Sequence, residues 1–412
     1  MVQEMRITLR NVGNINPCEV NDYVMAGGYK ALEKARSLDR AELIAEVERS
    51  GRLRGRGGAG FNTGLKWRSA FEAEADQKYV ICNADEGEPG TYKDRIILEN
   101  DPHSIIEGML ICAYTIGATE AYIYCRGEYR KAISILKNAI KQAEEKGLTG
   151  EVHMHVVSGA GSYVCGEETA LIQSLEGKRG EPRLKPPFPT IEGFRAKPTV
   201  VNNVETLATI PSIVEKGADW FKNTGKPGYP GTKIFSLSGD VKNKTYMEVP
   251  TDTTLRDIIY ELGGGIPNGR KLKAVQVGGS SCGFLTGDML DTSIDFDSMA
   301  EMGAALGSGS VLVIDDSHNM VDILVSIMEF FAHESCGKCV PCREGTRRMA
   351  DLIGKIAKGE GTEQDLELVS KLAGYMKTSC FCMLGQSATT AISSALNLFE
   401  EDFQAKLIRG EA

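Results

Sequence analysis

The sequence contains no apolar run long enough to cross a bilayer, which takes about 20 consecutive apolar residues. Its most apolar stretches are residues 105–116 and 321–332. Acidic residues interrupt both, with Glu107 in the first and Asp322 and Glu329 in the second. Positive charge is not in excess either, and a net charge of −9 argues against a general nucleic-acid-binding surface. We therefore expect no direct membrane span and no nucleic-acid partner.

A secretory signal peptide and a secretory cysteine spacing are also lacking. The 11 cysteines are therefore expected to be reduced thiols of a cytoplasmic protein. Glycine, in contrast, is abundant: the 46 glycines gather in loops, which suggests backbone that approaches ligands closely. A chain of 412 residues with 42% hydrophobic residues has room for two or three domains, each with its own core.

Residues 1–230 alternate between helix-like and strand-like segments. In chain order we expect a helix at 39–49, strands at 78–82 and 121–125, a helix at 128–146 and a strand at 151–157. Alternation of this kind predicts an α/β layer with mostly parallel strands. The turn-rich segment 226–231 predicts a domain boundary.

The rest of the chain predicts two smaller domains. The expected elements are strands at 232–239, 272–277 and 310–314, a helix at 254–261, and helices at 321–333, 343–358, 363–377 and 387–399. The first group forms a mixed α/β domain of about 90 residues, and the second forms a helical bundle. The expected domains are therefore 1–230, 231–318 and 319–412.

Four cysteines near the C-terminus have the spacing of a metal centre. Cys336, Cys339 and Cys342 lie two residues apart, and Cys382 follows far downstream. Three such thiolates can hold three corners of a cubane iron–sulfur cluster, which the distant thiolate completes. Zinc is the competing interpretation, but zinc sites usually show two separated cysteine pairs. The spacing favours a [4Fe-4S] cluster, which carries one electron at a time, and Cys380 could replace Cys382 as a ligand.

A glycine-rich loop follows the first expected helix. Gly55, Gly57 and Gly60 match the dinucleotide-binding fingerprint, but the match is weak because a helix, not a strand, precedes them. Bare amide groups in such a loop can cradle a phosphate, and Arg56 and Lys66 add positive charge. An RNA-binding Arg-Gly segment would be longer, repeated and disordered.

Four further segments accompany this loop. Residues 82–90 and 159–169 each follow an expected strand, and 185–189 and 201–206 complete the set. Ligands of open α/β sheets lie at the carboxyl ends of strands, so these segments are well placed to bind one. The acidic loop 82–90 alone would be an ordinary solvated turn, but the five segments together indicate a nucleotide site.

Together these segments resemble the flavin- and NADH-binding subunit of respiratory complex I. The same family includes the equivalent subunits of soluble NAD-linked iron hydrogenases and formate dehydrogenases. The resemblance runs from about Asn11 to Leu398. It implies a Rossmann-like FMN-binding domain, then a ubiquitin-like α+β domain, then a C-terminal four-helix bundle that holds one [4Fe-4S] cluster.

The resemblance also assigns site residues. The FMN pocket is expected to consist of Gly55, Arg56, Gly57, Lys66, Asn83, Asp85, Glu86, Gly87, Tyr163, Gly166, Glu167, Glu168, Asn202, Asn203 and Thr206. NADH is expected to contact Gly58, Phe61, Glu88, Lys185 and Phe188. The cluster ligands are expected to be Cys336, Cys339, Cys342 and Cys382.

Within these sets the resemblance implies particular roles. Lys66 and the glycine loop hold the flavin phosphate, and Lys185 meets the NADH pyrophosphate. Phe61 and Phe188 sandwich the adenine, while Glu88 repels a 2′-phosphate and so favours NADH over NADPH. Glu86 and Glu168 line the hydride-transfer site, although no side chain is expected to act as acid, base or nucleophile because the flavin carries the chemistry.

The sequence departs from the family pattern in a few places. Ser69 stands where many members have another aromatic contact for adenine, which puts nucleotide affinity in doubt. Asn62 replaces a usual proline, Gly87 replaces a frequent serine, and Cys380 is an additional thiol.

The implied function is hydride transfer from NADH to FMN, followed by single-electron transfer through the cluster to partner subunits. The expected partners are a thioredoxin-fold [2Fe-2S] subunit and a cluster-rich catalytic subunit, an iron hydrogenase, with ferredoxin as a further carrier. The alternatives within the family are the flavoprotein subunit of complex I and of an NAD-dependent formate dehydrogenase. A different class, a non-catalytic module for a ligand such as a corrinoid or a scaffold with structural zinc, also stays open.

Overall fold

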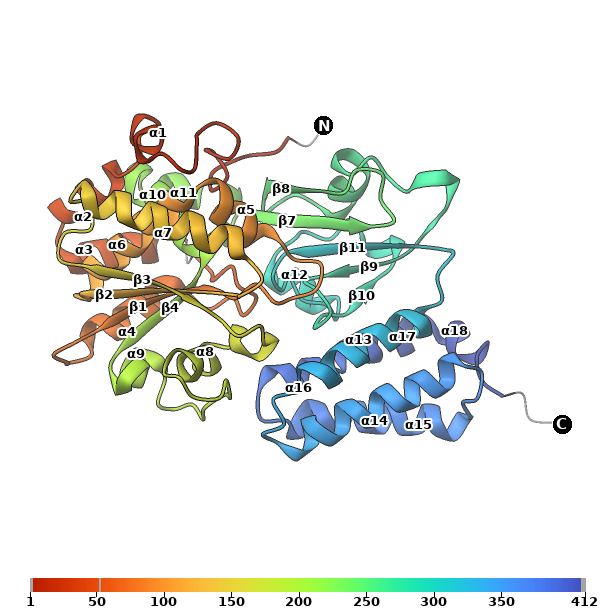
Figure 1. Cartoon of the computed structure of the whole chain (residues 1–412). Helices are drawn as coiled ribbons and strands as arrows, with labels where there is room; N and C mark the ends of the chain where they lie inside the picture. The colour runs from red at the N-terminus through yellow and green to blue at the C-terminus, as the bar shows by residue number, and fades with distance from the viewer. Residues whose placement is uncertain (1–2, 52, 409–412) are drawn as a thin grey trace. The chain divides into compact units, whose positions relative to one another are not determined.

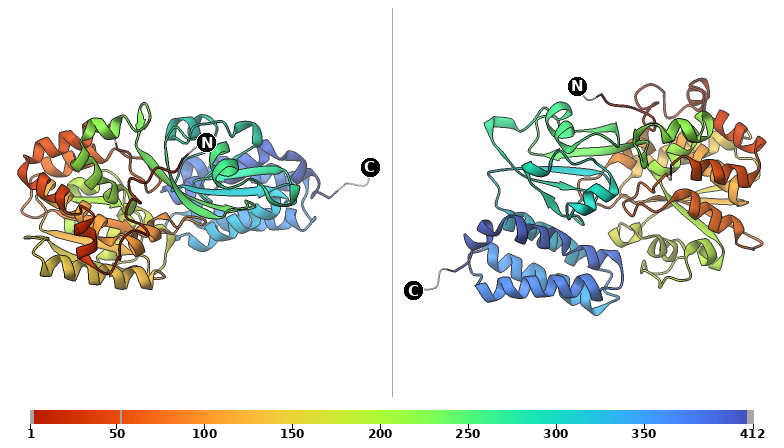
Figure 2. Two further views of the ribbon diagram at one scale, coloured as in Figure 1. Left: turned by 90° about the horizontal axis from the view of Figure 1, so that it is seen from above. Right: turned by 180° about the vertical axis from the view of Figure 1, so that it is seen from behind.

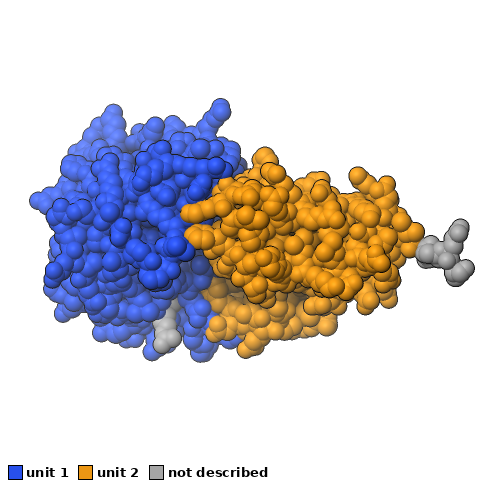
Figure 3. Space-filling view, turned by 90° about the horizontal axis from the view of Figure 1, so that it is seen from below, with its two compact units in different colours: residues 1–87, 91–236, 246–253 blue, residues 88–90, 237–245, 254–412 orange. Residues whose placement is uncertain are grey.

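The computed structural model describes residues 3–51 and 53–408. The chain forms two compact units (Figure 3). The first consists of residues 1–87, 91–236 and 246–253, and the second of residues 88–90, 237–245 and 254–412. The finer division at residues 230 and 318 stays a prediction.

The first part of the chain, to residue 230, alternates helices and strands (Figure 1). Its elements are α1 Val20–Met25, α2 Lys30–Ser37, α3 Arg40–Arg49, α4 Thr63–Glu72, β1 Tyr79–Ala84, α5 Lys93–Asn100, α6 Pro102–Ile116, β2 Glu120–Cys125, α7 Arg130–Glu145, β3 His153–Ser158, η1 Tyr163–Gly166, α8 Glu168–Leu175, α9 Pro189–Glu192, η2 Phe194–Ala196, β4 Thr199–Asn203, α10 Val204–Lys216, α11 Ala218–Lys222, β5 Gly225–Lys226 and β6 Tyr229–Pro230.

The remaining elements begin with a second sheet and end in helices. They are β7 Thr232–Gly239, β8 Thr245–Pro250, η3 Asp257–Leu262, η4 Pro267–Gly269, β9 Leu272–Val277, β10 Phe284–Leu285, η5 Gly287–Met289, α12 Phe296–Glu301, β11 Ser310–Asp315, α13 Met320–Glu334, α14 Val340–Ala357, α15 Glu363–Ser379, α16 Met383–Ser387, α17 Thr390–Leu398 and α18 Glu400–Gln404.

The sheet of the first unit has the strand order β3-β2-β1-β4, and every pairing in it is parallel. Helices α6, α7 and α10 cover one face, while α8 and α9 lie on the other (Figure 1). Its central strands are apolar and buried, as expected for strands covered on both faces. The carboxyl ends of all the strands therefore meet at one edge of the sheet, where ligands of such folds bind.

Helices α6 and α10 approach each other unusually closely. A Cβ atom placed on Gly108 of α6 would lie 2.1 Å from the carbonyl oxygen of Leu207 in α10. Only glycine allows this contact, and it fixes α10, which follows directly from β4. The packing of α10 against α6 therefore fixes the end of β4.

The second sheet has the order β10-β9-β11-β7-β8. A π-helix, η3, occupies the position of the helix expected at 254–261 and ends at Gly263. Further along the chain, α13, α14, α15 and α17 run side by side in all views (Figures 1 and 2) and form the expected bundle. No helix in the described part of the chain combines the length and apolar character that a bilayer crossing needs.

Most expected elements are confirmed within one or two residues at either end, including strands β1, β2, β7, β9 and β11 and helices α3 and α7. The helix expected at 387–399 is present as α17, which begins three residues later at Thr390, and the short helix α16 at Met383–Ser387 precedes it. Between the two, Thr389 Oγ1 donates to the carbonyl oxygen of Ala373 in α15 at 3.4 Å. Strands β4 and β8 were not expected from the sequence.

Candidate functional site

The glycine-rich loop lies between two helices, α3 and α4, as its sequence context predicts. The Gly55 N–H donates to the carbonyl oxygen of Phe61 at 2.8 Å, which closes the loop on itself. A Cβ atom on Gly57 would lie 3.1 Å from Cβ of Asn203, so the absence of a side chain lets this loop lie against the end of β4. The loop therefore presents backbone amides beside the carboxyl edge of the sheet.

Two asparagines stand side by side at that edge. Asn83 is the penultimate residue of β1 and Asn203 is the last residue of β4, and the two are direct partners in the parallel ladder. The Asn83 Nδ2 atom donates to the carbonyl oxygen of Gly166 at 2.9 Å, which ties the end of β1 to the segment after β3. Gly87 and Tyr163 make a second tie, because a Cβ atom on Gly87 would lie 3.1 Å from the tyrosine ring. The segments that the sequence singled out separately are thus brought together.

The polar side chains at this edge share one property: each has its acceptor oxygen occupied by a protein donor. The Oδ1 atoms of Asn83, Asn202 and Asn203 accept from the Asp85 N–H at 3.1 Å, the Trp67 indole at 2.8 Å and the Glu205 N–H at 3.0 Å, and Thr206 Oγ1 accepts from the Arg56 N–H at 2.8 Å. Each asparagine amide still has at least one N–H that can donate to a ligand, and Thr206 has its O–H. A wall of donors fits a ligand rich in acceptors, such as the phosphate and carbonyl groups of a flavin nucleotide.

Arg56 supplies a further donor. Its guanidinium is buried, and its Nε atom has no hydrogen-bond partner among the described residues. Burial lowers the pKa of Arg56, although nearby carboxylates of Glu205 and Glu248 oppose the change. A buried cationic donor with an open hydrogen bond is what an anionic ligand would satisfy. The residues present therefore fit FMN.

Two lysines and two glutamates form a charged group beside this wall. Lys66 Nζ lies 3.0 Å from Glu168 Oε2 and donates to the carbonyl oxygen of Val201 at 3.0 Å. Lys185 Nζ lies 2.9 Å from Glu168 Oε1 and 2.8 Å from Glu167 Oε1. Burial alone would raise the pKa of Glu168, but the two lysines hold it below its ordinary value. Glu168 is therefore an anion that fixes both lysines.

Glu86 is placed differently from the other predicted FMN residues. Its carboxylate accepts from the N–H groups of Asp94 at 2.8 Å and Arg95 at 3.1 Å, in the first turn of α5, and from the Tyr129 hydroxyl at 2.9 Å. Burial, followed by the charge of Asp94, raises the pKa of Glu86 to about 7. Both carboxylate oxygens thus hold protein groups, which makes Glu86 an anchor for the loop after β1.

The residues assigned to NADH are less closely connected. Phe61 and Phe188 are 55% and 53% exposed, which leaves their rings available for stacking. Ser69 donates to Thr190 Oγ1 at 2.8 Å, so the residue that departs from the family pattern bonds to α9. Glu88 belongs to the second unit, where its carboxylate accepts from the Ser281 N–H at 3.2 Å and hydroxyl at 3.1 Å.

The predicted cluster cysteines all lie at helix ends in the second unit. Cys339 caps the N-terminus of α14, Cys342 lies in its first turn and Cys382 caps α16, while Cys336 follows α13. Helix N-termini carry partial positive charge, which favours thiolates and the anionic cluster they bind. Three of the four thiols lie at such N-termini, while Cys336 follows the C-terminus of α13, and a set of four thiols fits an iron–sulfur cluster.

Cys380, the additional thiol, caps the C-terminus of α15 and is buried with this group. Its hydrogen bond lowers the pKa of Cys342 to about 6, with help from Ser335. A Cβ atom on Gly385 would lie 2.7 Å from the Cys380 sulfur, so this glycine makes room for it. Burial, in contrast, raises the pKa of Cys382 to about 11. The structure therefore gathers five thiols where a cubane needs four.

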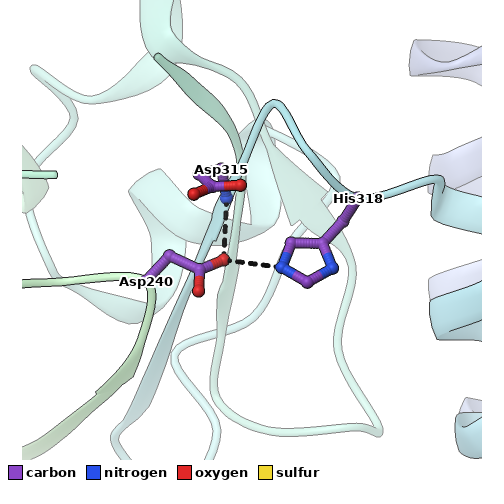
Figure 4. Close-up of side chains that lie close together, drawn as sticks. All are labelled: Asp240, Asp315 and His318. Carbon is purple, nitrogen blue, oxygen red and sulfur yellow. Dashed lines mark hydrogen bonds and ion pairs between the residues drawn. The ribbon is translucent and has the colours of Figure 1, made fainter. Parts of the chain in front are cut away.

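A second group of possible metal ligands lies in the same unit (Figure 4). His318 Nε2 is 3.0 Å from Asp240 Oδ2, which also accepts from the Asp315 N–H at 3.0 Å. Arg270 Nε lies 3.5 Å from Asp315 Oδ2, so a cation already balances this carboxylate. These contacts join the ends of β7 and β11, so the group has a structural role.

Sequence reasoning missed three residues that hold the site. Trp67 and Tyr129 supply hydrogen bonds to Asn202 and Glu86, and Lys93 is completely buried beside Asn203. Trp67 is one of only two tryptophans and follows Lys66 directly, a signal that could have identified it. A lysine next to an aspartate in an otherwise buried segment is a similar signal for Lys93.

Three family descriptions match the chain. The Nuo51 FMN-binding domain matches residues 47–212, the SLBB domain matches 234–285, and the NADH-ubiquinone oxidoreductase-F iron-sulfur binding region matches 322–406. The matches follow the order expected for the FMN, small α+β and cluster-binding segments. They favour an iron–sulfur cluster over structural zinc for the C-terminal cysteines.

Individual proteins are similar over nearly the whole chain. NADP-reducing hydrogenase subunit HndC of Solidesulfovibrio fructosivorans is 46% identical over 98% of this chain and 84% of its own length. An NADH-quinone oxidoreductase subunit of Rhizobium meliloti is 46% identical over 97% of both chains, and the corresponding subunit of Escherichia coli is 42% identical over 97% of this chain and 92% of its own. A crystal structure of NAD+-reducing [NiFe]-hydrogenase in the H2-reduced state has a TM-score of 0.88 at 36% identity, covering 100% of this chain and 68% of that one.

Proposed function

Because the chain belongs to the family of FMN- and [4Fe-4S]-binding flavoprotein subunits of complex I and NAD(P)-reducing hydrogenases, we propose that it passes electrons from NADH to partner subunits. It is an oxidoreductase subunit whose cofactors are FMN, one [4Fe-4S] cluster and NAD(H). FMN, when bound, would supply acceptance of a hydride and release of its two electrons one at a time. The protein's own part is to bind, orient and charge-balance the cofactors.

The wall of donors at the carboxyl edge of the first sheet is the observation that carries the FMN assignment. Asn83, Asn202, Asn203 and Thr206 have N–H or O–H groups to donate to the cofactor, and Arg56 adds a buried cation with an open hydrogen bond. Lys66 and Lys185, fixed by Glu168, would balance the phosphates of FMN and NADH. Phe61 and Phe188 would stack on the adenine.

The cysteines carry the second half of the function. Cys336, Cys339, Cys342 and Cys382 would ligate the cluster, and Cys380 would remain a fifth thiol beside it. A bound cluster would pass electrons on to a partner one at a time. One cluster cannot complete a reaction circuit, so the chain works with partners, and its relatives are subunits of multi-subunit enzymes.

The proposed partners are a thioredoxin-fold [2Fe-2S] subunit and a hydrogenase catalytic subunit in the cytoplasm. The similarity to subunit HndC and to the hydrogenase structure supports this choice. The equally similar NADH-quinone oxidoreductase subunits favour a respiratory complex as the second candidate. Purification of the tagged native complex, with iron, nickel and quinone-reductase measurements, separates the two, and a complex without hydrogen-evolving activity would reject the first.

Two measurements on the chain itself test the function. Anaerobic NADH should bleach the yellow flavin absorbance and produce the paramagnetic signal of a reduced cluster. Lys66→Ala should lower the FMN content of the purified protein at least about tenfold, since it removes a charge-assisted contact to the phosphate. Lys141→Ala, at an exposed lysine of α7, is the control and should keep its FMN. Full flavin retention in Lys66→Ala would contradict the phosphate assignment.

A further inference from the structure

Two buried lysines share one carboxylate beneath the flavin site. Lys93 Nζ lies 2.6 Å from Asp94 Oδ1 and 2.9 Å from Glu205 Oε2, with 1% of its side chain exposed. Lys233 Nζ lies 2.6 Å from the same Glu205 oxygen, with 0% exposed. Burial of an ammonium group is costly unless it is paired. Such a cluster therefore either stabilises the fold or acts on the ligand bound next to it.

Lys93 contacts the ligand-binding wall directly. Its Nζ atom lies 3.4 Å from Asn203 Oδ1, and Lys233 Nζ donates to the carbonyl oxygen of Ile234 at 3.0 Å. Asn203 Nδ2 in turn donates to Asp94 Oδ2 at 2.6 Å. Lys93 and Asp94 thus hold opposite ends of the Asn203 amide and leave one N–H for a ligand.

The two lysines also differ in charge. Burial alone would lower the pKa of Lys93, but Asp94, Glu205 and Glu86 raise it above its ordinary value. Burial lowers the pKa of Lys233 to about 7, despite Glu205. A charge in a water-poor interior acts over several ångströms with little screening. Lys93 is therefore a permanent cation one side chain away from the proposed flavin.

Resting on the proposed function, we propose that Lys93 is a positioning residue for FMN: it fixes Asn203 as a donor and places a buried positive charge beside the cofactor. Reduced flavin is more negatively charged than oxidised flavin at neutral pH. The Lys93 cation consequently stabilises the reduced state and raises the midpoint potential of the bound flavin. Lys233 pairs with the same Glu205, and we assign it a structural role only.

The test compares Lys93→Met with Lys233→Met in the full chain carrying its cluster. Each variant removes one lysine amino group that contacts Glu205, so a purely structural role predicts similar effects on FMN binding. We expect Lys93→Met to bind FMN about tenfold more weakly. We also expect the midpoint potential of its bound flavin to fall by about 30 mV. For two electrons this corresponds to a tenfold change in the ratio of the affinities for reduced and oxidised flavin. Lys233→Met should keep both values even if its melting temperature falls.

Equal shifts in the two variants, or an unchanged potential in Lys93→Met, would overturn the proposal. Should Lys93→Met fail to fold, Lys93→Met/Asp94→Asn removes the orphaned carboxylate charge and still deprives Asn203 of its ammonium partner. This double variant should still bind FMN several-fold more weakly, and wild-type affinity would reject the positioning role. A wild-type chain that binds no FMN would reject the proposed function itself, which is a different outcome.

Discussion

The flavin site and the cysteine site are built in opposite ways. The flavin site takes its polar groups from the ends of parallel strands, and those groups are already hydrogen-bonded to protein. The proposed cysteine site takes thiols from the ends of helices, where Cys342 Sγ lies 3.3 Å from the Ser335 hydroxyl and the Cys380 thiol lowers its pKa. The first should keep its shape without a cofactor, whereas the second should depend on its cluster to hold the thiolates together.

The largest effect that this comparison predicts is loss of the cluster. Cys382→Ser removes a thiolate that a serine hydroxyl cannot replace at neutral pH, so iron should fall from about four per chain to nearly none. FMN content should not change, because the flavin site is preformed. Iron, labile sulfide and flavin are measured on anaerobically purified protein.

Cys380→Ala is the matched control and should keep its iron. If Cys380→Ala lost the cluster and Cys382→Ser kept it, the fourth ligand would be Cys380. Loss of FMN together with iron in Cys382→Ser would contradict a preformed flavin site, since that site would then depend on the cluster.

Glu86 offers a test of the preformed site through pH. Its pKa is raised to about 7 in the folded chain, so the folded state keeps a proton that the unfolded state releases near its ordinary value of 4.5. Stability from this group is complete below about pH 4.5 and is lost as pH rises towards 7, by an amount on the order of 3 kcal/mol.

Glu86→Gln stays neutral throughout and should lack this loss. The difference in unfolding free energy between wild type and variant, followed by denaturant titration from pH 4.5 to 7.5, measures it. A difference that is constant with pH would show that Glu86 is ionised in the fold throughout this range.

Gly108→Ala tests the close helix contact behind β4. The new methyl group would lie 2.1 Å from the Leu207 carbonyl oxygen, and such overpacking costs about 1–3 kcal/mol. Gly354→Ala is the control, because this glycine of α14 has nothing within 4 Å of the new atom. The control should gain about 0.5–1 kcal/mol from helix propensity. Thermal unfolding measures both, and equal stability changes would mean that the contact is not tight.

The smallest expected effect concerns coenzyme choice. Glu88→Gln removes the charge predicted to repel a 2′-phosphate, and it keeps an oxygen for Ser281. We expect the kcat/KM ratio of NADH over NADPH to shrink about fivefold, or about 1 kcal/mol for one screened charge. Ser281→Ala, which keeps the charge, should leave the ratio nearly unchanged. An unaltered ratio in Glu88→Gln would reject charge repulsion as the cause.

The sequence predicted the alternating layer because periodicity and turn residues are local signals. Strand β4 escaped notice because only Thr199, Val200 and Val201 favour a strand before two asparagines. Its place is fixed by pairing with β1, a contact between segments more than a hundred residues apart. The π-geometry of η3 has no local signal either.

The family resemblance assigned the site residues, and that assignment stays a prediction. The physical character of these residues could not be predicted from the sequence. The Asn202 amide oxygen accepts from the indole of Trp67, which lies 135 residues earlier. Glu86 accepts hydrogen bonds from two N–H groups in the first turn of α5. The sequence of its own loop does not indicate these contacts. Such properties depend on tertiary contacts, which spacing alone does not specify.

The position of the glycine loop between two helices has a practical consequence for engineering. Coenzyme preference in dinucleotide-binding proteins is usually altered at an acid about 20 residues beyond the glycines, where the ribose binds. Counting in this way here leads to residues 75–80, where the acid is Asp76, which lies between α4 and β1 and pairs with Lys197. A substitution chosen by that recipe would disturb this ion pair and leave the residues assigned to NADH unchanged.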